Sequence, residues 1–300
     1  MSPSHFDYAS PATLPEAIAL FAEYGARARI LAGGTDLLAR IERGQIAADL
    51  LVSLQRIEAL RAISFDSGEG LSIGAAARLA EVAEHTDVRV HYPVLAEAIS
   101  LMATPQIRNM GTIAGNIGNG SPCADSVPVL IAVSATAEIV GPGGVRRAAV
   151  GDLFRGPGLL ALDPNEFLVR VHLPPPPANT GFAFKKLPAR TAVDVAAVNV
   201  GAMVAADQGR CKEVRLILGA VGPTPLRAAR SEALLAGRVL DDTLISEAGV
   251  LAAEDARPIS DVRASAAHRR AMVAVLVRRA LLAAAEQAGI RVQSNGGSSS

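Results

Sequence analysis

The chain has 300 residues, of which 50% are hydrophobic and 19% charged, and its 29 basic side chains balance 29 acidic ones. This composition provides enough apolar surface for a sizeable core and excludes a disordered protein. Zero net charge argues against a nucleic-acid binder, because neutralising phosphates requires a local excess of Lys and Arg. Cys123 and Cys211 are too few and too far apart for a disulfide framework, a zinc site or an iron–sulfur cluster. With no visible signal peptide and no clean apolar span, we expect a soluble, cytoplasmic protein.

The first 55 residues predict a helix, a strand, a glycine turn and a second helix. Thr13 followed by Glu16 is typical of a capping box, which begins a helix. A short apolar strand at 28–32 leads into Gly33-Gly34-Thr35-Asp36, and residues 37–43 have helical patterning. The order of elements places a glycine turn directly between a strand and a helix.

Helices and strands alternate irregularly over the rest of the chain, which predicts a mixed α and β protein. Four successive prolines at 174–177 exclude a helix or a central strand and mark a domain boundary. The Gly/Ser-rich tail at 294–300 is expected to be disordered. The other expected elements are strands at 49–54, 71–74, 195–206 and 213–221, helices at 78–84, 93–102, 226–236, 244–253 and 266–288, and a helix followed by a strand within 126–140.

The first glycine turn has the chemistry of an anion site. Glycine accepts positive φ and lets a ligand approach without meeting a Cβ. The first turn of the following helix presents unpaired N–H groups, which favour an anion such as a phosphate. The alternative is an ordinary tight turn in which Thr35 or Asp36 caps the helix.

A second glycine segment, residues 103–125, strengthens the case for a ligand. It is expected to form a long loop at 111–122, and it carries four glycines among Thr, Asn and Ser residues, with Arg108 as its one cation. A loop of this length is usually functional or disordered, and its composition favours anion binding by main-chain N–H groups. Neither a P-loop nor a Rossmann fingerprint is present. These observations leave open a dinucleotide held by two separate glycine loops.

Three segments together resemble the FAD-binding medium subunit of the molybdenum hydroxylases, the family of the carbon monoxide dehydrogenase and xanthine dehydrogenase flavoproteins. They are residues 32–36, 106–117 and 121–125. Residues 184–194, 218–227 and 265–281 extend the resemblance over nearly the whole chain. The sequence departs from the family pattern at Ala114, where many members have glycine, and at His268, where tyrosine is frequent.

The resemblance implies an α+β fold with two domains. Residues 1–176 would form an FAD-binding domain of the vanillyl-alcohol-oxidase (PCMH) type, with subdomains at about 1–55 and 56–176. Residues 177–292 would form a smaller α+β domain with a three-stranded sheet and helices, and 293–300 a tail.

The resemblance also implies which residues hold FAD. Ala32 to Asp36 and Gly111 to Asn116 would wrap the pyrophosphate, while Thr104, Ser121 and Asp125 would bond to the ribose, phosphate or ribityl groups. Leu168 and Lys186 would lie near the adenine or flavin ends. The full predicted set is Leu31, Ala32, Gly33, Gly34, Thr35, Asp36, Thr104, Ile107, Gly111, Thr112, Ala114, Gly115, Asn116, Ser121, Asp125, Leu168 and Lys186.

By the same resemblance, the chain is the flavoprotein subunit of an oxidoreductase. A large subunit with the molybdenum cofactor and a small subunit with [2Fe-2S] clusters would be its partners, in a dimer of heterotrimers, and electrons would leave through FAD to an external acceptor. The sequence offers no catalytic residue and no metal site of its own, since its five histidines are scattered. A self-contained FAD oxidoreductase and a nucleotide-free scaffold are the alternatives. Arg269, Arg270, Arg278 and Arg279 form a basic helix face that is either solvated or a subunit contact.

Overall fold

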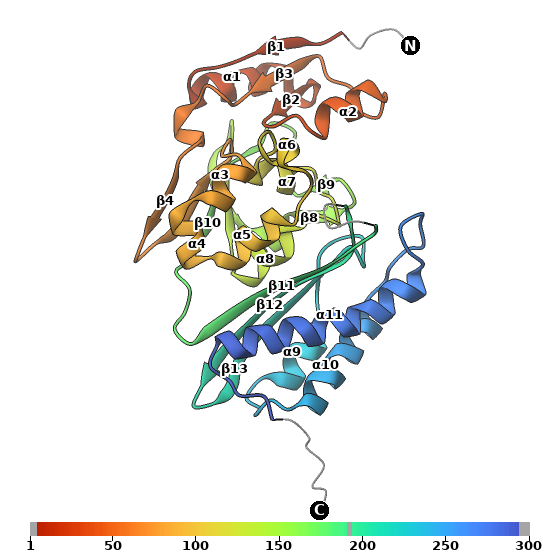
Figure 1. Ribbon diagram of the computed structural model, residues 1–300. Coiled ribbons are helices and arrows are strands. Elements are labelled where there is room, and N and C mark those ends of the chain that lie inside the picture. Colours follow the sequence, from red (N-terminus) through yellow and green to blue (C-terminus); the bar gives the residue numbers. More distant parts are fainter. Residues whose placement is uncertain (1–4, 191–193, 294–300) are drawn as a thin grey trace, which may run out of the picture. The chain divides into compact units, whose positions relative to one another are not determined.

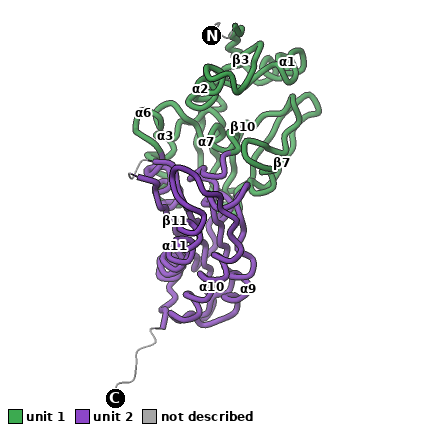
Figure 2. The backbone as a smooth tube through the Cα atoms, turned by 90° about the vertical axis from the view of Figure 1, so that its right-hand side faces the viewer, with its two compact units in different colours: residues 1–91, 103–120, 134–175 green, residues 92–102, 121–133, 176–300 purple. Residues whose placement is uncertain are grey.

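The computed structural model describes residues 5–190 and 194–293, so the tail at 294–300 lies outside the described residues. Figure 1 shows the helices and strands, and Figure 2 shows the two compact units into which the chain divides. Unit 1 comprises residues 1–91, 103–120 and 134–175, and unit 2 comprises residues 92–102, 121–133 and 176–300. Two short segments of the N-terminal half therefore belong to the same unit as the C-terminal region, which the sequence did not predict.

Unit 1 contains a small parallel sheet and a larger antiparallel one. The parallel sheet has the order β1-β3-β2, and the antiparallel sheet has the order β4-β5-β10-β6-β7. A two-stranded ribbon of β8 and β9 lies in the same unit. The bounds are β1 Asp7–Ala9, α1 Leu14–Tyr24, β2 Ala28–Leu31, α2 Leu37–Glu42, β3 Leu50–Ser53, β4 Ile63–Asp66, β5 Gly70–Gly74, α3 Leu79–Glu84, α4 Thr86–His91, α6 Pro105–Arg108, α7 Ile113–Gly118, β6 Thr136–Gly141, β7 Gly144–Ala149, β8 Phe154–Gly156, β9 Leu159–Leu160 and β10 Phe167–Leu173.

One apolar core joins the two sheets of unit 1. The Thr13 hydroxyl accepts the Glu16 N–H and begins α1, as the capping box predicts. The buried side chains of Ala17 and Phe21 on α1 pack with those of β3 and with Phe167 of β10, whose ring centroid lies 5.1 Å from that of Phe21. Ala28 of β2 also belongs to this core, so the strand that leads into the glycine turn is fixed within unit 1.

Unit 2 is built on an antiparallel sheet of three long strands, β11, β12 and β13, with β14 as a two-residue fourth strand. Alternate residues of β12 face opposite sides. Val198, Val200 and Val204 pack in the core formed with α9, α10 and α11, while Met203 and Ala205 pack against α8. The bounds are α5 Pro93–Ser100, α8 Ser126–Ala132, β11 Thr180–Pro188, β12 Ala196–Asp207, β13 Arg210–Gly219, β14 Leu226–Arg227, α9 Ala229–Leu235, α10 Asp242–Asp255 and α11 Ala266–Gln287.

Two glycines in the strands allow helices to lie directly on this sheet. A Cβ at Gly201 would lie 2.6 Å from the carbonyl carbon of Pro128 in α8, and a Cβ at Gly181 would lie 2.8 Å from the main-chain nitrogen of Ala288, which ends α11. Real Cβ atoms do not approach this closely. Both faces of the sheet therefore depend on backbone-to-helix contacts that only glycine permits.

Three expectations from the sequence are corrected by the structure. The stretch 111–122 is not a continuous loop, because α7 forms within it under the burial of Ile113 and Ile117. The helix expected from residue 226 begins only at Ala229, since Leu226 and Arg227 pair with β13 and add a short strand to the expected three. Strands β1, β4, β7, β8, β9, β10 and β11 were not predicted.

We expect Gly201→Ala to lower the free energy of unfolding by about 1–3 kcal/mol, because the added methyl group would displace α8 from the sheet. Urea denaturation followed by circular dichroism measures this change. Gly143→Ala is the control, since nothing lies within 4 Å of its Cβ position, and a surface change of this kind stays within about 0.5 kcal/mol. Equal stability of the two variants would contradict the close-approach argument.

Candidate functional site

The two glycine loops meet within unit 1. A Cβ at Gly33 would collide with the carbonyl oxygen of Met110 and would lie 2.7 Å from the Cα of Gly111. A Cβ at Gly111 would in turn lie 3.8 Å from the Thr35 hydroxyl. The space that a side chain at position 33 would fill is therefore taken by the second loop, and not kept open for a ligand as the sequence suggested. Because Gly33 has no side chain, the two main chains can approach each other this closely.

The first loop presents a row of main-chain donors. Among the described residues, no acceptor lies in hydrogen-bond range of the N–H groups of Gly33, Gly34, Thr35 or Asp36. Gly34 has φ +72°, in the left-handed region that favours glycine. Gln55 donates from Nε2 to the Ala32 carbonyl oxygen over 2.9 Å. This bond anchors the loop through a carbonyl and uses none of its N–H groups. A row of unpaired N–H groups is the arrangement that binds a phosphate or diphosphate.

The tight-turn alternative for this loop lacks its expected cap. Asp36 occupies the N-cap position of α2 with helical dihedrals, and its carboxylate makes no capping hydrogen bond. The N–H of Leu38 is taken by the Gly34 carbonyl instead, at 3.1 Å. The helix begins without a side-chain cap, so the donors of the first loop stay available.

The second loop uses many of its donors internally, unlike the first. The Thr112 hydroxyl accepts the Gly115 N–H over 3.0 Å, and the Thr112 carbonyl accepts the Asn116 N–H. The Gly111 N–H is donated to the Ile107 carbonyl over 2.7 Å. Thr104 likewise caps α6 by accepting the Ile107 N–H. A hydroxyl that accepts one bond keeps its own O–H to donate, so the exposed Thr104 still has a donor for a ligand, while Thr112 is buried.

The remaining predicted residues of unit 1 lie on the same elements. Leu31 ends β2, and Ile107 is exposed on α6. Ala114 is buried in α7 and is absent from the residues with positive φ, so alanine meets no strain where many relatives have glycine. Leu168 is buried in β10, against which α7 packs.

Ser121, Asp125 and Lys186 belong to unit 2, where two of them bond to each other. Lys186 Nζ lies 2.7 Å from Asp125 Oδ2, and both side chains are almost fully buried. Asn199 donates from Nδ2 to Asp125 Oδ1 over 2.8 Å. Burial raises the pKa of Asp125, while the Lys186 ammonium and the Asn199 amide oppose that rise. Asn199 is not among the residues predicted from the sequence, although an asparagine inside the apolar run 196–206 is a signal for a buried polar partner.

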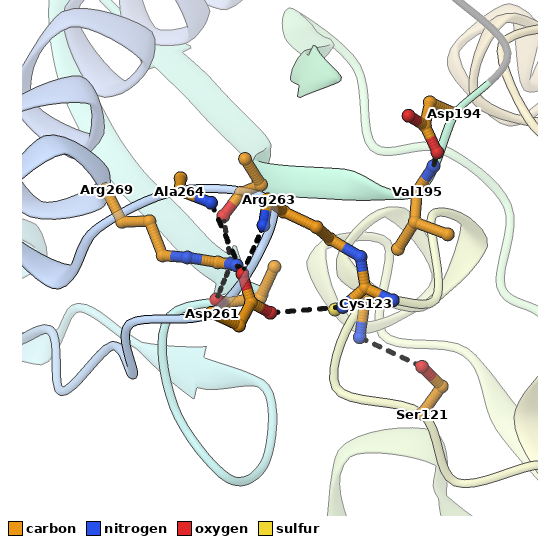
Figure 3. Close-up of polar contacts among 10 residues, drawn as sticks. Ser121, Cys123, Asp194, Val195, Asp261, Arg263, Ala264 and Arg269 are labelled. Atoms are coloured by element: carbon orange, nitrogen blue, oxygen red, sulfur yellow. Dashed lines mark hydrogen bonds and ion pairs between the residues drawn. The ribbon is translucent and has the colours of Figure 1, made fainter. Parts of the chain in front are cut away.

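Two of the four arginines on the basic face expected on α11, Arg269 and Arg278, bond to groups within unit 2. Arg269 is buried and donates to the carbonyls of Ala197 and Ala220 and to Asp261, while Arg278 pairs with Asp242 (Figure 3 shows Arg269 and Asp261). The main-chain N–H of Arg263 and the Arg269 guanidinium hold the pKa of Asp261 at about 2. Arg269 therefore ties the start of α11 to strand ends inside unit 2.

Cys123 lies near the same network, beside Arg263 (Figure 3). Its N–H is donated to the Ser121 hydroxyl over 3.2 Å. Burial raises the pKa of the Cys123 thiol, with Arg263 opposing the rise. A raised pKa keeps the thiol neutral, which agrees with a structural role and disfavours a nucleophile.

Within residues 5–190 and 194–293, no three His, Cys, Asp or Glu side chains are grouped so as to hold a metal ion. None of the described helices is both long enough and apolar enough to cross a bilayer.

Two family models match the chain. Residues 4–176 match the FAD binding domain in molybdopterin dehydrogenase, and residues 182–284 match the CO dehydrogenase flavoprotein C-terminal domain. A xanthine dehydrogenase FAD-binding subunit of Escherichia coli is 33% identical over 96% of this chain and 100% of its own length. A carbon monoxide dehydrogenase medium chain of Afipia carboxidovorans is 34% identical over 94% of this chain and 97% of its own.

Solved structures agree with these matches. A carbon monoxide dehydrogenase chain from Hydrogenophaga pseudoflava superimposes with a TM-score of 0.91 at 34% identity, covering 96% of this chain and 99% of that one. A chain of quinoline 2-oxidoreductase from Pseudomonas putida 86 gives a TM-score of 0.90 at 30% identity, covering 96% and 99%.

We expect Gly33→Ala to lower the free energy of unfolding by about 1–3 kcal/mol even without any ligand, because the methyl group would force the two loops apart. Thermal unfolding of the ligand-free protein measures the loss. Gly118→Ala serves as the control, since its Cβ would meet nothing within 4 Å and alanine favours the helix by up to about 1 kcal/mol. A Gly33→Ala variant as stable as Gly118→Ala would disprove the contact.

The lowered pKa of Asp261 should make the free energy of unfolding depend on pH in the acid range. A carboxyl whose folded pKa is lowered from 3.8 to about 2 stabilises the fold above pH 3.8 and loses that contribution as the pH falls through about 2. Asp261→Asn should therefore destabilise the protein most at neutral pH and progressively less toward about pH 2.5. Urea unfolding at a series of pH values checks this, and a stability difference independent of pH would count against it.

Proposed function

The chain belongs to the family of FAD-binding subunits of the molybdenum hydroxylases, and from this premise we propose that it carries electrons from a [2Fe-2S] partner subunit through FAD to an external acceptor. The observation that carries the proposal is the row of main-chain donors at Gly33 to Asp36, held against the second glycine loop. FAD, when bound, supplies the redox chemistry, since a flavin can accept electrons singly and deliver them in pairs. The protein supplies position and electrostatics.

The residues of unit 1 fit the diphosphate of FAD. Four consecutive N–H groups at 33–36 lack an acceptor among the described residues, and the Thr35 hydroxyl lies beside Gly111. A diphosphate offers anionic oxygens to such a row without a balancing cation. We propose that this row makes the main contact with the pyrophosphate, that Thr104 adds a hydroxyl donor, and that Thr112 shapes the second loop beside it. The other predicted contacts, from Leu31 and Ile107 to Leu168, complete the proposed site.

We propose two partner subunits, a large one with the molybdenum cofactor and a small one with [2Fe-2S] clusters, assembled as a dimer of heterotrimers. The relatives named medium chain support this proposal by analogy. The domain boundaries at residues 176 and 292 and the cytoplasmic location stay predictions. A self-contained FAD oxidoreductase is the second candidate, and no observation in the structure favours it.

The FAD proposal predicts one FAD per chain after reconstitution, with the absorption bands of a bound flavin. Gly34→Val is the test variant, because a β-branched residue is strained at φ +72° and would turn the row of N–H groups. We expect it to weaken FAD binding by about a hundredfold or more. Gly44→Val also sits at positive φ, +69°, but outside both loops, and should keep FAD. An absent flavin spectrum in the wild type, or equal FAD retention in the two variants, would refute the site.

The electron-transfer proposal is tested by co-expression with the genes that neighbour this chain's own gene. Co-purification with a cysteine-rich small subunit and a large subunit is the expected result, together with flavin reduction that requires them. Oxidation of a substrate at full rate by the isolated chain would instead establish the self-contained enzyme.

A further inference from the structure

The second glycine loop lies in a segment of unit 1 whose two flanking segments belong to unit 2. The chain leaves unit 2 after Met102 and returns to it at Ser121, so residues 103–120, here called the excursion, have both their ends in unit 2. At each crossing point the first or last residue has a left-handed φ, +45° at Ala103 and +61° at Gly120. A left-handed alanine is strained, and such a conformation persists only where the surrounding structure holds it.

One side chain bonds to both ends of the excursion. Lys186 Nζ donates to the Leu101 carbonyl oxygen over 2.9 Å and to Asp125 Oδ2 over 2.7 Å. Leu101 lies two residues before the exit, and Asp125 lies a few residues after the return. The lysine comes from β11 and is only 3% exposed. A single buried ammonium thus joins two points of the chain that are separated by the excursion.

The return end has two further anchors on the same sheet. Asn199 of β12 donates to the second oxygen of Asp125 over 2.8 Å. The N–H of Ala220, just after β13, donates to the Pro122 carbonyl over 2.7 Å. The exit end follows the last turn of α5, where the N–H groups of Leu101 and Met102 donate to the carbonyls of Glu97 and Ile99. Among the described contacts, Lys186 is the side chain that links the exit directly to the return.

Fixing the two ends lowers the entropy that the excursion loses when it packs into unit 1, because the closure of the segment is already established. Removing one partner of a buried ion pair also leaves the other charge uncompensated, which is strongly destabilising. The effect of Lys186 on the second loop is thus transmitted along the chain and needs no contact with a ligand.

We propose that Lys186 is a positioning residue for FAD binding, which clamps residues 101 and 125 so that the excursion presents the second glycine loop to the first. This inference rests on the proposed function for its FAD readout, while its structural part concerns the ligand-free chain. Asp125 and Asn199 complete the clamp.

Hydrogen exchange of the full-length, ligand-free chain tests the structural part. In Lys186→Met we expect the amides of residues 103–120 to exchange about tenfold faster or more than in the wild type, because the segment opens more often. Lys186→Arg should restore slow exchange to within about threefold, since a guanidinium can donate to both oxygens. Glu232→Gln is the control, because it removes the charge of a different buried carboxylate of unit 2, which accepts from Leu216 and Arg227. It should leave exchange in 103–120 unchanged.

FAD titration of the same four proteins supplies the second readout. We expect Lys186→Met to raise the FAD dissociation constant about tenfold, with recovery in Lys186→Arg and no change in Glu232→Gln. If Lys186→Met does not fold, Asp125→Asn is measured by exchange alone and should accelerate exchange in the same residues. Unaltered exchange in 103–120, or an equal rise in Glu232→Gln, would overturn the clamp. A wild-type chain that binds no FAD would sink the proposed function, and the exchange data would still decide the clamp.

Discussion

Two loops from distant parts of a chain can share one ligand only if their main chains come within a few ångströms of each other. In this protein the approach depends on Gly33, where any Cβ would collide with the carbonyl of Met110. The contact is between backbones, so its strength does not depend on matched side chains but on the absence of one. The core shared by α1, β2, β3 and β10 fixes the strand that leads into the first loop, and the Thr112-capped helix α7 forms part of the second. The candidate site lies where the two loops meet.

The two loops differ in how many main-chain N–H groups they leave unpaired. In the second loop, the N–H groups of Gly111, Gly115 and Asn116 are used to build and end short helices. In the first loop, the N–H groups of Gly33 to Asp36 have no acceptor among the described residues. An anion bound here would therefore be held mainly by the first loop, with the second acting as a wall and as the source of a hydroxyl donor. This division follows from helix capping, which consumes donors wherever a glycine-rich stretch becomes helical.

Unit 2 shows how the same chain supports the site from elsewhere. Its sheet receives helices on both faces through glycines at 181 and 201. Two buried cations, Arg269 and Lys186, tie separate segments of this unit together. Arg269 joins strand ends to the loop before α11, and Lys186 joins the two ends of the excursion. Each cation is paired with a carboxylate, as burial of a charge requires. Residues that the family resemblance places near FAD thus also have a structural role of their own.

The sequence by itself determined the local features whose cause is local. Thr13 with Glu16 predicted the start of α1, and apolar runs located β2, β3, β12 and β13. The proline run 174–177 lies between β10 and β11, where no strand or helix forms. The glycine loops and the family resemblance also came from residues that are adjacent in the chain.

Only the tertiary structure decided what depends on residues far apart. No local pattern shows that Gly33 faces Met110, that Asn199 bonds to Asp125, or that residues 92–102 and 121–133 pack in unit 2. Helix α7 was hidden as well, because its glycines disfavour a helix until Thr112 caps it and Ile113 and Ile117 are buried. The reason is common to all of these cases: burial and backbone contact are set by the partner surface, and that surface lies elsewhere in the chain.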